Sequence, residues 1–172
     1  MIGLLRFLGI LNAAVWCGSA IFVTVGLPAV FSPELQKLLT AAGVGFAAEA
    51  VIDRYFLLQY CCGAIALAHL AAEYFYCGRP VRRMNLILVL GMLALALGGG
   101  LWAQPKMRTL HEVKYFGKTV PQQTQAAKDF ALWHGASQSV NVLVMAGLIA
   151  YLWSVSNPSE SARFGGVNKI RG

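Results

Sequence analysis

The segment Phe130-Ala-Leu-Trp-His134-Gly-Ala-Ser137-Gln138-Ser-Val-Asn141 opens a stretch that is long and apolar enough to cross a membrane. At about 100° per residue, four side chains fall within roughly a third of the helix circumference, and we call them the polar stripe: His134, Ser137, Gln138 and Asn141. Lipid cannot satisfy an imidazole, a hydroxyl or an amide, so we expect the stripe to face protein or a water-filled cavity.

The whole chain has the composition of a polytopic membrane protein. Of its 172 residues, 58% are hydrophobic and only 12% are charged, and the mean hydropathy is +0.61. This length allows one compact domain and no separate soluble enzyme. The net charge of +7 lies in loops and tails beside apolar segments. We therefore expect the lipid bilayer, and not nucleic acid, as the partner of these basic residues.

Four apolar segments have the length of transmembrane helices, about 20 residues each: 7–31, 55–76, 84–102 and 130–153. The short connection 77–83 makes the second and third segments an antiparallel hairpin. The sequence therefore predicts an all-α fold, a four-transmembrane-helix bundle formed by residues 1–155. A polar, basic tail of residues 156–172 is predicted to be disordered.

The start of the chain and its cysteines need separate interpretations. Residues 1–20 look like a signal peptide, but the apolar run continues to Phe31, so we expect an uncleaved first helix. Cys17, Cys61, Cys62 and Cys77 lie inside or at the ends of the apolar segments. They indicate apolar packing more than a disulfide framework or a metal cluster.

The two loops on the side opposite the termini contain helical patterns. Ser32-Pro33-Glu34 supplies a helix cap, a first-turn proline and an early carboxylate. Apolar residues then recur at helical spacing through Phe46, which predicts an amphipathic helix in the first loop that runs through Glu49 and Asp53 into the second span. In the third loop, 104–129, we expect a short helix near residues 105–111 and then an irregular excursion.

The other spans also carry polar groups on one face. The first span has Asn12, Trp16 and Ser19 on one side, and the second has Gln59, Cys62, His69 and Glu73. The third offers small residues, Gly91 and 98–100, which suit close helix packing. We expect the polar faces to meet in one bundle interior. An alternative is that they only fasten helices together and bind no ligand.

The fourth-span pattern Phe130-x-x-x-His134-Gly135-x-Ser137-x-x-x-Asn141 resembles the signature of the transmembrane protein 205-like family. Further similarity lies in Trp16-x-Gly18 with Pro28-Ala-Val-Phe31, in Arg54-Tyr55-Phe56 and in Pro105-Lys-Met-Arg108. The resemblance covers nearly the whole chain, although the long third loop and Cys61-Cys62 match no motif. It implies a four-helix integral membrane fold. The bacterial members are mostly domains of unknown function, and eukaryotic members are linked to tolerance of platinum drugs.

The side of the membrane that each loop faces follows from the basic residues. They divide evenly between the two sides, but Arg79, Arg82 and Arg83 crowd the short second loop. Because short cytoplasmic loops are rich in Lys and Arg, we expect both termini in the cytoplasm. With the resemblance, this predicts an integral protein of the bacterial inner (plasma) membrane.

Metal and catalytic chemistry receive little support. His69 and His134 differ in predicted depth by roughly 15 Å, too far to share one iron. A zinc or copper site at the outer surface would use His111, Glu112, Asp129 and His134. Ser137 is three residues from His134 but lacks an orienting carboxylate, and His69 and Glu73 permit only a mutual contact. We predict no enzyme, no catalytic residue, no bound metal and no cofactor.

The remaining prediction is a binding role within the membrane. A polar bundle interior would accept a small molecule or a metal complex, and the ligand-binding candidates are His134, Ser137, Gln138, Asn141, Trp16 and Arg108. Transport would require a homo-oligomer, because four helices rarely enclose a pathway. The alternatives are a structural or accessory subunit of a membrane complex and, less favoured, a haem- or metal-dependent redox protein.

Overall fold

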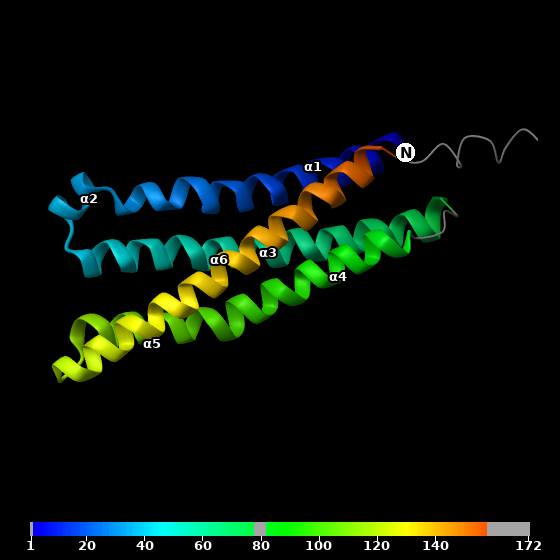
Figure 1. Cartoon of the computed structure of the whole chain (residues 1–172). Helices are drawn as coiled ribbons and strands as arrows, with labels where there is room; N and C mark the ends of the chain where they lie inside the picture. The colour runs from blue at the N-terminus through cyan, green and yellow to red at the C-terminus, as the bar shows by residue number, and fades with distance from the viewer. Residues whose placement is uncertain (1, 78–81, 158–172) are drawn as a thin grey trace, which may run out of the picture.

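The computed structural model describes residues 2–77 and 82–157, and the regular structure in these ranges is helical (Figure 1). Four helical segments are long and apolar enough to span a membrane: Gly3–Ala29, Ala41–Tyr76, Arg83–Phe116 and Val120–Ser156. The prediction of an all-α, four-span bundle is confirmed. The predicted disordered tail lies, beyond Asn157, outside the described residues.

The first span is not α-helical along its whole length. Helix α1 covers Ile2–Ile21, a π-helical segment η1 follows at Phe22–Gly26, and a 3₁₀ segment η2 at Leu27–Phe31 contains Pro28 in its first turn. The chain leaves the span at Ser32, whose extended backbone starts the short helix α2, Pro33–Leu38. The Ser32 hydroxyl accepts the Leu35 N–H at 3.4 Å, as the predicted cap requires.

The predicted amphipathic helix of the first loop is interrupted. Leu39 is extended, with φ −115° and ψ 140°, and the Thr40 hydroxyl accepts the Gly43 N–H at 3.2 Å. Thr40 therefore caps a new helix, α3 (Ala41–Cys77), which continues unbroken for 37 residues through the second span. The prediction that the helix through Glu49 and Asp53 continues into the second span is confirmed. The prediction that this helix begins at Ser32 is wrong, because the spacing of apolar residues does not show that Thr40 caps a new helix within the pattern.

The third loop contains far more helix than predicted. Helix α4 (Arg83–Gly98) passes through a second π-helical segment, η3 (Gly99–Ala103), into α5 (Gln104–Phe116), and α6 (Val120–Ser156) begins after a turn of residues 117–119. The expected irregular excursion is wrong. Pro121 lies in the first turn of α6, where a missing N–H costs nothing, and Gln123 Nε2 donates to the Gly117 carbonyl at 2.9 Å.

The spans form a closed bundle in which α6 crosses in front of the others (Figure 1). Helix α1 packs against α3 and α6, and α4 likewise packs against α3 and α6. The largest fully buried side chains in the core include Trp16, Gln59, Val89, Leu148 and Tyr151. The interior is therefore apolar with a few enclosed polar groups.

The helices are longer than a bilayer is thick. At 1.5 Å per residue, the 37 residues of α3 and of α6 each reach about 55 Å, against about 30 Å of hydrocarbon. The excess lies at the end opposite the N-terminus, where α5 and the first turns of α3 and α6 lie together (Figure 1). We call residues 41–54, 104–116 and 120–129 the helical extension.

Candidate functional site

Polar contacts near the middle of the bundle join α1 to α3. Trp16 Nε1 donates a short hydrogen bond to Gln59 Oε1, and both side chains are buried. One helical turn away along each helix, Asn12 Nδ2 donates to the Cys62 carbonyl at 2.9 Å. Both predicted polar faces therefore point inward, and the single N–H donor of the Trp16 side chain is occupied by protein.

Asn141 of the polar stripe connects three spans. Its Oδ1 accepts the Tyr55 hydroxyl at 2.8 Å, and its Nδ2 donates to Thr24 Oγ1 at 2.6 Å. Thr24 belongs to η1, Tyr55 to α3 and Asn141 to α6. The inward orientation predicted for the stripe is right at this position, and Asn141 acts there as a fastener.

The outer part of the polar stripe lies differently. His134 and Gln138 are exposed and Ser137 is half-buried. The His134 ring stacks on Phe130 with the centroids 5.9 Å apart, and the Ser137 hydroxyl donates to the His134 carbonyl at 3.0 Å. The expected convergence of the polar faces in one bundle interior does not extend to His134 and Gln138, whose side chains lie on the outside of the four spans.

A row of small residues borders this exposed part, and the sequence interpretation did not recognise it. Ala131, Gly135 and Ser139 recur every four residues on α6 and are all exposed. A Cβ built on Gly135 would meet no heavy atom within 4 Å. The signal was the four-residue spacing of small residues, which permits close approach of another helix.

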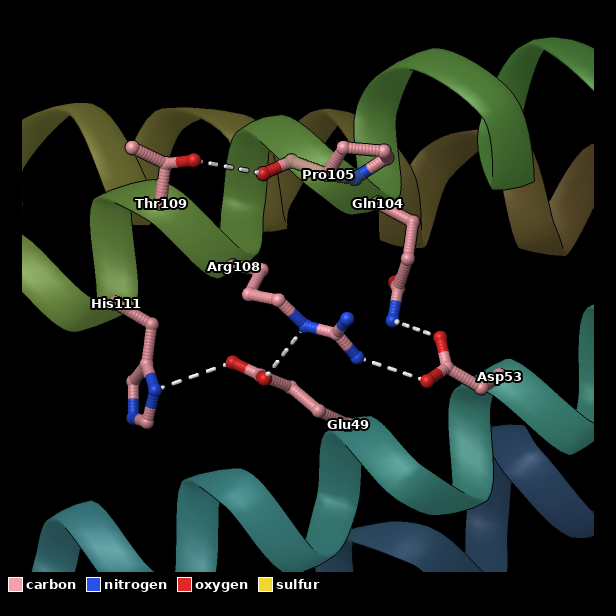
Figure 2. Close-up of polar contacts among 7 residues, drawn as sticks. All are labelled: Glu49, Asp53, Gln104, Pro105, Arg108, Thr109 and His111. Atoms are coloured by element: carbon pink, nitrogen blue, oxygen red, sulfur yellow. Dashed lines mark hydrogen bonds and ion pairs between the residues drawn. The ribbon is translucent and has the colours of Figure 1, made fainter.

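A cluster of polar contacts joins α3 to α5 in the helical extension (Figure 2). We call it the α3–α5 ladder, and its members are Glu49, Asp53, Gln104, Arg108 and His111. Arg108 lies between two carboxylates of α3, with Nε 3.2 Å from Glu49 Oε2 and Nη2 2.8 Å from Asp53 Oδ2. Gln104 Nε2 donates to Asp53 Oδ1 at 3.1 Å. The hydrogen bond with Asp53 is the largest of the contributions, ahead of that with Glu49, that raise the pKa of the Arg108 guanidinium, which therefore stays charged. Arg108 thus binds protein carboxylates in this structure.

His111 completes the α3–α5 ladder in a buried position. Its Nδ1 lies 3.1 Å from Glu49 Oε1, an ion pair when the imidazole is protonated, although the angle does not meet hydrogen-bond geometry. Its ring packs against Phe46, Tyr115 and Phe130, with centroids 5.1, 5.0 and 5.9 Å away. Phe130 therefore packs against both His111 and His134.

The spacing of the α3–α5 ladder residues along the sequence indicates two polar helix faces, but it does not show that these faces pair with each other. Glu49 and Asp53 are one turn apart on α3, and Gln104, Arg108 and His111 repeat at intervals of four and three on α5. Such spacing places each set on one helix face. What the spacing could not supply was that the two helices lie side by side.

The proposed metal ligands do not come together. Among the described residues, no group of three or more His, Cys, Asp and Glu side chains gathers closely enough to hold a metal ion. His111 lies beside Glu49, and His134 stacks on Phe130. His69 is buried, with Nε2 3.0 Å from the Leu5 carbonyl, and the ion pairs of the described chain do not include the permitted contact with Glu73.

Comparison with known proteins identifies one family. The family model described as "Domain of unknown function (DUF4149)" matches residues 11–115, which run from α1 through α5 and include Trp16, the α3 carboxylates and Arg108. No curated protein matches the chain, and no solved structure matches it.

Proposed function

We propose that this chain, which belongs to the DUF4149 family, is a self-associating structural unit of the membrane. Copies of the chain would meet through the exposed part of the α6 polar stripe. The observation that carries this proposal is the exposure of His134 and Gln138 in an apolar segment. In hydrocarbon, an amide or imidazole without a hydrogen-bond partner costs several kcal/mol. These side chains therefore require a polar partner from outside the four spans.

A second copy of the chain fits this requirement. The amide of Gln138 both donates and accepts hydrogen bonds, so it can pair with the same amide across a two-fold axis. Ala131, Gly135 and Ser139 beside it leave room for a neighbouring backbone. The chain would then act as part of this assembly, which corresponds to the predicted alternative of a structural or accessory subunit of a membrane complex.

Cysteine cross-linking in membranes tests the proposal. In a background with the native cysteines replaced, Gly135→Cys is expected to cross-link two full-length chains. Ile87→Cys, on the exposed side of α4 with 69% of the residue accessible, is the control and should remain monomeric. Adding Gln138→Leu should reduce the Gly135→Cys product at least severalfold. Equal cross-linking at both positions, or none, would rule out this contact.

A second candidate is the binding of a small molecule or a metal complex by the same stripe, with a role in stress or drug tolerance. It is favoured by the resemblance to the transmembrane protein 205-like family and by the open imidazole and amide at His134 and Gln138. Purification followed by mass spectrometry of co-eluting molecules tests it. His134→Ala should then remove the molecule and leave stability unchanged, whereas Asn141→Ala should lower stability, because Asn141 holds Tyr55 and Thr24.

The proposed place for this assembly is the bacterial inner membrane with both termini in the cytoplasm. The supporting observation is the crowding of arginines in the second loop, residues 77–83. A reporter fused after the last residue, with a second in the 117–119 turn, tests the orientation.

A further inference from the structure

The end of the bundle that carries the N-terminus contains a groove between the start of α4 and the end of α6. It has a volume of about 540 Å³, and its lining includes Arg82, Met84, Ile149, Trp153, Ser154 and Asn157. The polar lining residues lie at the ends of the two helices, with Met84 and Trp153 beside them, and Ala146, Ile149 and Ala150 lie further into the span of α6. The groove is therefore amphipathic along its length.

Arg82 is held in place by neutral groups. Its Nη1 donates to Ser154 Oγ at 3.3 Å, and Ser154 Oγ donates to Asn85 Oδ1 at 2.7 Å. In residues 2–77 and 82–157, the ion pairs with carboxylates involve Arg108 and His111, not Arg82. A guanidinium has five N–H donors, and within residues 2–77 and 82–157 the side chain of Arg82 uses one of them, toward Ser154.

The surroundings of Arg82 are also electropositive. Arg83 follows it and is exposed, and Arg6 lies at the same end, where its Nη2 donates to the Ser156 carbonyl at 2.8 Å. Of the acidic residues in the described chain, only Glu73 lies near this end. Arg82 does not cap α4 with its side chain, so the first N–H groups of α4 add partial positive charge.

The rest of the groove is suited to hydrocarbon. Met84 is 61% exposed, Ile149 52% and Trp153 72%, and the groove continues over Ala146 and Ala150. Tryptophan at the end of a span is typical of the headgroup level of a bilayer. We infer that this groove binds an anionic phospholipid, with the phosphate on Arg82 and an acyl chain along Met84 and Ile149.

Native mass spectrometry of the full chain in detergent tests this inference with two lipids of the same chain length, phosphatidylglycerol and phosphatidylcholine. The wild-type protein is expected to retain phosphatidylglycerol about tenfold better, and Arg82→Gln should abolish that preference. Arg54→Gln is the matched control. Arg54 is an exposed arginine of α3 at the opposite end of the bundle from the groove, and its loss changes the net charge by the same amount as the loss of Arg82.

A second variant separates the headgroup from the acyl chain. Ala150→Trp fills the groove and keeps every charge, so it should also weaken phosphatidylglycerol retention, and it remains informative where Arg82→Gln fails to fold. Retention of phosphatidylglycerol by Arg82→Gln at the wild-type level would overturn the inference. Complete displacement of the lipid by millimolar inorganic phosphate would also overturn it, because the groove would then bind a free anion.

Discussion

Trp16 of α1 and Gln59 of α3 are joined by a hydrogen bond from the indole N–H to the amide oxygen, with both side chains enclosed by the bundle. A buried donor and its acceptor are worth less as a pair than the cost of leaving one of them alone. This asymmetry makes the contact measurable by substitution.

Replacing Gln59 by leucine should destabilise the protein by about 1–3 kcal/mol, because the Trp16 N–H then lacks an acceptor. The double variant Trp16→Phe with Gln59→Leu removes donor and acceptor together and should recover part of that loss. A double-mutant cycle of unfolding in detergent provides the measurement. Additive losses in the double variant would contradict the pairing.

The two carboxylates of the α3–α5 ladder should differ in importance. Glu49 has 14% of its side chain exposed and serves both Arg108 and His111, whereas Asp53 has 47% exposed. Glu49→Gln is expected to cost about 1–3 kcal/mol, and Asp53→Asn less than about 1 kcal/mol, since exposed pairs are screened by solvent. Thermal unfolding should therefore show the larger decrease in Tm for Glu49→Gln. Equal decreases would mean that Glu49 has no special role.

Glycines that contact histidine rings should tolerate no side chain. A Cβ on Gly45 would overlap the His111 ring, and one on Gly9 would overlap the His69 ring, whereas Gly18 has nothing within 4 Å. Gly45→Ala is expected to lower stability by 1–3 kcal/mol or so, because the ring must move. Gly18→Ala should be neutral or stabilising by up to about 1 kcal/mol through helix propensity. A stable Gly45→Ala protein would show that His111 is free to leave its position.

The fold could be predicted from the sequence where the signal is local. Hydropathy over about 20 residues locates a span whatever its neighbours are, and Ser32 caps α2 as its spacing indicated. Within the helical extension, the helix through Glu49 and Asp53 and the helix near residues 105–111 were predicted, whereas the helix over 112–116 and 120–129 was not, because Lys, Gln, Thr and Pro121 are typical of loops. These residues are helical since α5 and α6 pack against each other, which no window of sequence contains.

The helix face that carries the candidate site residues could be predicted from the sequence, but the burial of each residue on that face could not. Helical periodicity placed His134 and Asn141 on nearly the same side of α6, and that angle is correct. Asn141 meets Thr24 and Tyr55, while His134, two turns further out, is exposed. Which of two residues on one face has a neighbour depends on where other helices pass, and that is a property of the assembled bundle.

The two π-helical segments divide the spans into two mechanical kinds. Helices α3 and α6 are continuous over 37 residues each, while the first and third spans contain η1 and η3, with Gly26 in one and Gly99-Gly100 in the other. Kinks in long helices occur at such segments. We therefore expect a thinner bilayer to be accommodated by bending of the first and third spans at these segments, while α3 and α6 tilt as continuous helices and carry residues 41–54 and 120–129 with them.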